Sequence, residues 1–133
     1  MTNGWQHIAV TVGPSSTVKY YVNGSYVGEN SAGSLGDLNS IDGYIVFGTL
    51  QKGNASNQFT GKIDETAFFN TNLSANGIAD VYNNGHGISN IFTGSSNYSP
   101  DNVIGYWRFN EGSGTVASDN SNNANHLDHL NTH

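Results

Sequence analysis

The sequence contains no cysteine, so no disulfide can brace the fold and no thiolate can bind a metal ion or act as a nucleophile. Positive charge is also scarce: four lysine and arginine residues stand against ten aspartate and glutamate residues, which gives a formal net charge of −6. Nucleic-acid binding is therefore not expected, because no basic stripe could displace counterions from phosphate groups.

Long apolar runs are missing as well. No stretch approaches the length needed to span a membrane, and residues 1–10 lack the basic and apolar regions of a signal peptide. We therefore predict no membrane insertion, while a secreted origin stays open because large β-sandwiches can do without disulfides. Charged residues make up only 11% of the 133-residue chain, so neutral asparagine, glycine, serine and threonine carry the polar surface. This length suffices for one domain with a modest core.

The clearest local pattern is a predicted β-hairpin at residues 17–29. Asn23-Gly24 separates two alternating runs, and this dipeptide favours a two-residue turn because both positions tolerate positive φ. The turn brings two tyrosines together on one face of the hairpin. It predicts three cross-strand pairs: Val22 with Ser25, Tyr21 with Tyr26, and Tyr20 with Val27.

A strand, a turn and a short helix are predicted in the middle of the chain. Residues 59–69 alternate with the two-residue period of a strand. A helix is expected near 74–83, with Ser74 as its N-cap and Asn84-Gly85 at its end.

The two tryptophans are predicted to lie in the core, because Trp5 and Trp107 each sit in an alternating apolar strand. We predict further that Trp107 lies next to the strand at 59–69, contributed by the same chain or by a neighbouring copy.

Several segments together resemble laminin G-like domains of the concanavalin A-like lectin/glucanase superfamily. They are WQHIAVTV at residues 5–12, YVNG at 21–24, FTGKIDETAFF at 59–69 and YWRFNEGSGT at 106–115. The resemblance implies an all-β fold, an antiparallel jelly-roll (concanavalin A-like) β-sandwich, with the one short helix near 74–83.

The segments occur in an unusual order, because the pattern that typically closes such a domain precedes the pattern that opens it. The order predicts three parts: residues 1–85 as the second half of a sandwich, 86–102 as a linker, and 103–133 as the opening strand and loop of a unit. Two explanations are open, a segment of tandem repeats or a permuted, reduced sandwich. Few residues are present that would blunt an edge strand, so we expect an oligomer or a larger assembly.

Catalysis is not predicted. Glycosidases of this superfamily carry a run of the form E-x-D-x-x-E, whose spacing keeps the acid and the nucleophile on one face of the sheet. No such run occurs in this chain. Asp64 and Glu65 are adjacent, so their side chains are expected to point to opposite faces.

Calcium is the cofactor that the resemblance implies, because laminin G-like domains often bind it. Asp119, Ser121 and Asn123 place oxygen atoms at alternate positions, and Ca²⁺ prefers such hard oxygen ligands. Asp64 and Asp119 also fall on positions that carry acids in the family pattern. The alternative is that this loop, with its single carboxylate, only solvates itself.

The candidate ligand-binding residues are Tyr21, Asn23 and Tyr26. An exposed aromatic face can stack on a sugar ring, and a neighbouring amide supplies directional hydrogen bonds. The alternative is that the tyrosines merely cover the sheet.

The leading hypothesis is a non-catalytic recognition or adhesion module, which binds a glycan or a protein partner at an extracellular or virion surface. The alternative is a structural or decoration component of a larger assembly, such as a phage capsid or tail fibre.

Overall fold

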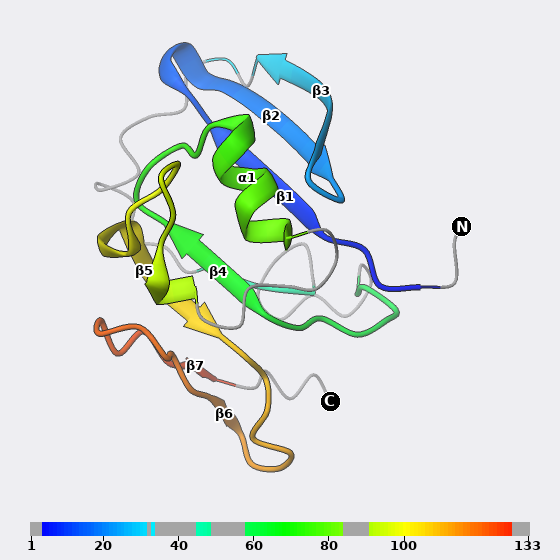
Figure 1. Ribbon diagram of the computed structural model, residues 1–133. Helices are drawn as coiled ribbons and strands as arrows, with labels where there is room; N and C mark the ends of the chain where they lie inside the picture. Colours follow the sequence, from blue (N-terminus) through cyan, green and yellow to red (C-terminus); the bar gives the residue numbers. More distant parts are fainter. Residues whose placement is uncertain (1–3, 32, 34–44, 49–57, 84–90, 129–133) are drawn as a thin grey trace. The chain divides into compact units, whose positions relative to one another are not determined.

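Figure 1 shows a computed structural model of the chain, which describes residues 4–31, 33, 45–48, 58–83 and 91–128. The strands are β1 (Ile8–Val12), β2 (Thr17–Val22), β3 (Ser25–Ser31), β4 (Thr66–Phe69), β5 (Val103–Trp107), β6 (Val116–Ala117) and β7 (Leu127–Asp128). The described residues also form the helix α1 (Ala75–Tyr82) and the 3₁₀ turns η1 (Pro14–Ser16), η5 (Ile91–Thr93) and η6 (Pro100–Asn102). Two compact units divide the chain, residues 1–40 with 69–102 and residues 41–68 with 103–133.

The first unit is built on the three-stranded antiparallel sheet β1-β2-β3. At the predicted turn, Asn23 and Gly24 have φ angles of 50° and 74°, which confirms the hairpin. Asn23 also ties the turn to the start of β1. Its backbone N–H donates to the His7 carbonyl at 2.8 Å, and its side-chain oxygen accepts the His7 N–H at 3.0 Å.

The register of the hairpin departs from the prediction at one point. Tyr21 faces Tyr26 as expected, but Tyr20 faces Gly28 rather than Val27. A β-bulge between Tyr20 and Tyr21 accommodates the extra residue on β3. Each pair beyond the bulge is therefore displaced by one residue relative to a regular ladder.

The two faces of this sheet differ in exposure. Tyr21 and Thr11 are buried on one face. The helix α1 lies against that face, because it contacts β3 and because the rings of His7 and Tyr82 are 5.5 Å apart (Figure 1). The opposite face, called the apolar face below, leaves large apolar side chains exposed. They are Ile8, Val10, Val12, Tyr20 and Val27.

The helix predicted near 74–83 is confirmed as α1. The Ser74 hydroxyl accepts the Gly77 N–H at 3.1 Å, which caps the first turn. Asn83 follows the last turn with φ 48°, so a left-handed residue ends the helix. The stop expected at Asn84-Gly85 lies outside the described residues.

The second unit holds most of β4, which pairs with β5, and the antiparallel pair β6-β7. Val103, Tyr106 and Trp107 are buried, so β5 supplies much of the core of this unit. The Trp107 ring lies 5.5 Å from that of Phe47. Both predictions for Trp107 are confirmed, since it is buried and its strand pairs with β4 of the same chain. The core prediction for Trp5 is wrong: it precedes β1 and is 67% exposed.

The strand predicted at 59–69 is shorter than expected, because β4 begins only at Thr66. Glu65 has φ 49°, a left-handed conformation that interrupts an extended chain. The Glu65 N–H donates to Asp64 Oδ1 at 3.0 Å, a local bond that competes with strand pairing. Residues 59–64 of the predicted strand therefore lie in an irregular segment.

The all-β class with antiparallel sheets and one α-helix is as predicted for the part of the chain that the structure describes. Within the same residues, no helix combines the length and the apolar character that crossing a membrane requires. The three-part division at residues 85 and 102 stays a prediction.

Candidate functional site

The predicted ligand residues Tyr21, Asn23 and Tyr26 come together at the hairpin. The two tyrosine rings meet edge to face, with centroids 5.9 Å apart. Tyr26 is 52% exposed, whereas Tyr21 is only 4% exposed, so Tyr26 is the ring that a ligand can reach and Tyr21 supports it. The side-chain oxygen of Asn23 accepts the His7 N–H, while no hydrogen bond joins its amide nitrogen to another of the described residues. Glycan binding here stays a prediction.

The phenol of Tyr26 is a hydrogen-bond donor at neutral pH. Partial desolvation and the carboxylate of Glu29, which also accepts its hydrogen bond, raise the pKa of Tyr26 above its ordinary value. The hydroxyl therefore keeps its proton.

Asp119, a predicted metal ligand, is buried and accepts four hydrogen bonds. One carboxylate oxygen accepts the backbone N–H groups of Tyr106 (2.9 Å) and Ser121 (2.8 Å), and the other accepts the Asn125 N–H (2.9 Å) and the Ser121 hydroxyl (2.7 Å). Burial pushes the pKa of this carboxyl upward, but the donors outweigh burial and hold the pKa below its ordinary value. We call residues 119–125 the Asp119 loop.

The Asp119 loop is also tied to β5. Trp107 Nε1 donates to the Asn125 carbonyl at 2.8 Å, and the Asn125 amide donates to the Ile104 carbonyl at 2.8 Å. The Asp119 N–H donates to His126 Nδ1 at 3.1 Å. These bonds hold the Asp119 loop against β5 and His126.

Three of the four predicted calcium ligands, Asp64, Asp119 and Ser121, use side-chain oxygens in hydrogen bonds with protein groups, and Asn123 donates to Ser121 through its N–H groups. The Ser121 hydroxyl donates to Asp119 and accepts the Asn123 N–H at 3.2 Å, while Asp64 Oδ1 accepts the neighbouring Glu65 N–H. No group of three or more histidine, aspartate or glutamate side chains that could hold a metal ion occurs among the described residues. In this arrangement an ion would have to displace donors from Asp119, so calcium stays a prediction.

Glu65 is engaged in a second polar cluster that the sequence did not reveal. Its carboxylate accepts the Tyr106 hydroxyl and pairs with Arg108 Nε at 3.3 Å. Burial and then the Glu65 carboxylate raise the pKa of Tyr106 well above its ordinary value, so the phenol is a firm donor. No motif links Glu65 to Arg108, because the two residues are far apart in the sequence and meet only across the β4-β5 pair.

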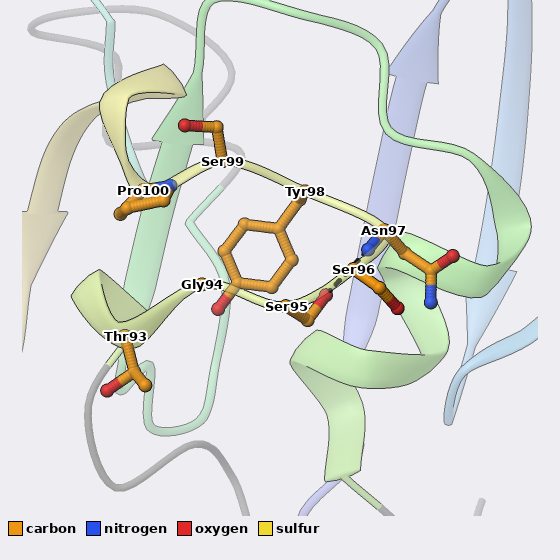
Figure 2. A pocket seen from close by; sticks show the side chains of 8 residues that line it. All are labelled: Thr93, Gly94, Ser95, Ser96, Asn97, Tyr98, Ser99 and Pro100. Atoms are coloured by element: carbon orange, nitrogen blue, oxygen red, sulfur yellow. Dashed lines mark hydrogen bonds between the residues drawn. The ribbon is translucent and has the colours of Figure 1, made fainter.

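A shallow, open hollow of about 550 Å³ lies over residues 93–100, and sequence reasoning missed it. Figure 2 shows the chain curving around the ring of Tyr98, after which we name it the Tyr98 hollow. It is lined by Thr93, Gly94, Ser95, Ser96, Asn97, Tyr98, Ser99 and Pro100. The one available signal was a run of small polar residues around an aromatic residue, but the Asp119 loop has a similar polar composition.

Comparison with known proteins shows the family to which the chain belongs. Residues 1–79 match a laminin G model described as the concanavalin A-like lectin/glucanases superfamily. The crystal structure of an S-layer domain-containing protein from Clostridium thermocellum is similar, with 31% sequence identity and a TM-score of 0.48. The similarity covers 62% of this chain and 41% of that chain, so the match spans less than half of the solved structure. No curated protein matches the chain.

Proposed function

The chain belongs to the laminin G-like family of the concanavalin A-like lectin/glucanases superfamily, and from this premise we propose that it is a non-catalytic recognition module. We propose further that it binds a glycan or a protein partner at an outer surface, extracellular or on a virion. The observation that carries the proposal is the ring of Tyr26, half exposed beside the hairpin turn and supported by the buried Tyr21.

Tyr26 has the two properties that a sugar-binding aromatic needs. Its exposed ring offers a stacking surface, and its hydroxyl oxygen, whose proton is donated to Glu29, can accept a hydrogen bond from a sugar hydroxyl. The edge-to-face contact with Tyr21 fixes the ring before a ligand arrives, which lowers the entropy cost of binding.

A glycan array tests the proposal with three proteins: the full chain, Tyr26→Ala and Tyr20→Ala. We expect Tyr26→Ala to weaken binding about tenfold, since aromatic stacking contributes on the order of 1 kcal/mol beyond its buried area. Tyr20 is a matched control, because it is also a partly exposed tyrosine of the same hairpin but lies on the apolar face. Equal binding by the full chain and Tyr26→Ala would reject Tyr26 as the glycan site.

The proposal of a non-catalytic role is supported by the state of the adjacent acids Asp64 and Glu65. Asp64 accepts a backbone N–H, and Glu65 is held by Tyr106 and Arg108. A glycosidase needs two carboxyl groups about 5–10 Å apart on either side of a scissile bond. We expect no new reducing ends when the chain is incubated with oligosaccharides, and their appearance would contradict the proposal.

The alternative function, a structural or decoration component of a larger assembly, is favoured by the apolar face of β1-β2-β3. Five large apolar side chains are exposed there, and contiguous exposed apolar surface marks an interaction site. This alternative includes the proposal that the chain forms an oligomer or joins a larger particle.

Sedimentation of the isolated chain tests the alternative. We expect the wild-type chain to sediment above its monomer mass of 14.2 kDa and Val10→Asp to sediment as a monomer. Val116→Asp is the matched control, because Val116 is a similarly exposed valine on β6, a strand of a different sheet. A wild-type monomer that melts cooperatively would count against the assembly role.

A further inference from the structure

We infer that the Tyr98 hollow is a second binding site of this chain, and that its ligand is a neutral oligosaccharide. The hollow lies beyond residues 1–79, the part of the chain that matches the superfamily. It shares a ligand class with the proposed function but none of the residues around Tyr26, so each proposal can fail without the other.

The hollow has a frame that is fixed before any ligand binds. The Tyr98 hydroxyl donates to the Ile91 carbonyl at 3.0 Å, and the Ser95 N–H donates to the Tyr98 carbonyl at 3.1 Å. Gly94 has φ +70°, and a Cβ at this position would lie 2.7 Å from Pro100, so only glycine fits the turn. Such preorganisation reduces the entropy lost on binding.

The lining of the hollow offers hydroxyl groups beside the ring of Pro100, while the ring of Tyr98 is buried beneath them. Thr93 and Ser96 are exposed, and within the described ranges no residue forms a hydrogen bond with either hydroxyl. The Ser99 hydroxyl accepts the Asp101 N–H at 3.2 Å and keeps its own proton for a ligand. The half-buried Pro100 adds apolar surface beside these groups. Hydroxyl groups next to apolar ring surface suit a sugar, which presents both O–H groups and C–H faces.

The charge next to the hollow selects against acidic sugars. The Asn97 amide donates to Asp80 Oδ2 at 2.9 Å, and hydrogen bonds from Ser95 and then Asn97 lower the pKa of Asp80. Asp80 therefore carries a negative charge at neutral pH. None of the residues that line the hollow is a lysine or an arginine. A uronic or sialic acid would meet repulsion without a cationic partner, whereas a neutral sugar would not.

The size of the hollow fits a few sugar units. Its volume of about 550 Å³ lies within the roughly 300–1,000 Å³ of small-molecule sites. One side is open, so a ligand would be only partly enclosed. We therefore expect weak, millimolar binding that is read by spectroscopy rather than by capture assays.

Amide correlation spectra of the ¹⁵N-labelled full chain test the inference. The probes are cellotetraose, chitotetraose, maltotetraose and mannotetraose, with tetragalacturonate as the acidic control. We expect at least one neutral probe to shift the amide signals of residues 93–100, and tetragalacturonate to leave them unchanged. No shift at 93–100 with any of the four neutral probes would overturn the inference.

Two variants assign the binding to the hollow. The double variant Thr93→Val with Ser96→Ala removes both hydroxyls with little change of shape, and we expect about tenfold weaker binding, the loss that follows from two neutral hydrogen bonds. Unchanged amide signals outside residues 93–100 would verify that this variant folds. Tyr26→Ala should bind at the hollow as the wild-type chain does. Shifts confined to the surroundings of Tyr26, or equal binding by the double variant, would overturn the inference, and the first of these results would leave the proposed function standing.

Discussion

The Asp119 loop and the Tyr98 hollow are built from similar small polar residues, yet their polar groups face in different directions. At residues 119–125, four donors converge on one buried carboxylate. At residues 93–100, the chain instead curves around an aromatic ring whose single hydroxyl is bonded to Ile91 (Figure 2). The hydroxyls of Thr93 and Ser96 are then left at the surface.

The difference follows from what occupies the centre of each segment. A buried carboxylate must be satisfied by hydrogen bonds, because an uncompensated charge in a low-dielectric interior costs several kcal/mol. The loop around Asp119 therefore turns its donors inward. A tyrosine ring makes no such demand, and among the described residues no hydrogen bond is formed with the hydroxyls of Thr93 and Ser96. Two segments with similar composition can thus enclose a carboxylate in one place and leave hydroxyl groups at the surface in the other.

The largest loss of stability that we expect comes from replacing Trp107, the residue of β5 that donates a hydrogen bond to the Asp119 loop. Trp107→Ala should lower the free energy of unfolding by about 3–5 kcal/mol, because it empties a buried site and removes the donor to Asn125. Trp5→Ala, which removes an exposed tryptophan, should change it by less than about 0.5 kcal/mol. Urea denaturation followed by circular dichroism measures both values. Equal losses would show that Trp107 is not in a packed core.

Removing the central carboxylate is the next test. Asp119→Ala leaves its donors without an acceptor, and we expect a loss of about 3 kcal/mol in the free energy of unfolding. Asp101→Ala serves as the control, because Asp101 is exposed in η6 and its removal should cost little. A loss below about 1 kcal/mol for Asp119→Ala would mean that the loop does not depend on its carboxylate.

A matched pair of glycines probes the frame of the Tyr98 hollow. Gly94 and Gly112 both have φ +70°, but a Cβ would meet Pro100 at 2.7 Å in the first case and nothing within 4 Å in the second. Gly112→Ala should cost about 1 kcal/mol for the left-handed backbone, and Gly94→Ala about 2 kcal/mol because the contact adds strain. Thermal melts compare the two. Equal costs would show that the turn around Tyr98 has room to relax.

Acid should weaken the Asp119 loop. The pKa of Asp119 is lowered in the folded chain, so its stabilising contribution is complete above the unfolded value of about 3.9 and is lost as pH falls through the lower folded pKa. We expect the stability difference between the wild-type chain and Asp119→Asn to shrink below about pH 4. A difference that stays constant down to pH 2 would contradict this assignment.

The smallest expected change in stability is the rise in Tm on adding calcium. An ion would compete with four hydrogen bonds for the Asp119 oxygens, so we expect weak binding and a small rise in Tm that Asp119→Asn removes. A site held at a hundredfold excess over its Kd would add about 2.7 kcal/mol, and a weak site adds less at the same concentration. Identical melting curves in calcium and in chelator would end the calcium prediction.

Features governed by neighbouring residues were predictable from the sequence. The Asn23-Gly24 turn and the Ser74 cap depend on interactions within a few residues, and both occur where the pattern placed them. The position of β5 beside β4 was also predictable, because family resemblance supplied a long-range pairing that local patterns do not contain.

Features that depend on distant partners were not predictable. An alternating pattern does not fix where a strand begins or what packs against it: Trp5 precedes β1 and is exposed, whereas Trp107 lies in β5 and is buried. The left-handed backbone at Glu65 and its bonds to Tyr106 and Arg108 have no local signature. The Tyr98 hollow was missed because its run of small polar residues has a composition similar to that of the Asp119 loop.

The bulge between Tyr20 and Tyr21 has a consequence for how the length of this hairpin can change. Elsewhere in the hairpin, inserting or deleting one residue would turn every following side chain of the strand to the other face. At the bulge, one residue on β3 is already in excess, so deleting Val27 would restore a regular ladder and leave Lys19 opposite Glu29. This position is where natural relatives and engineered variants should differ in length by one residue without losing the sheet.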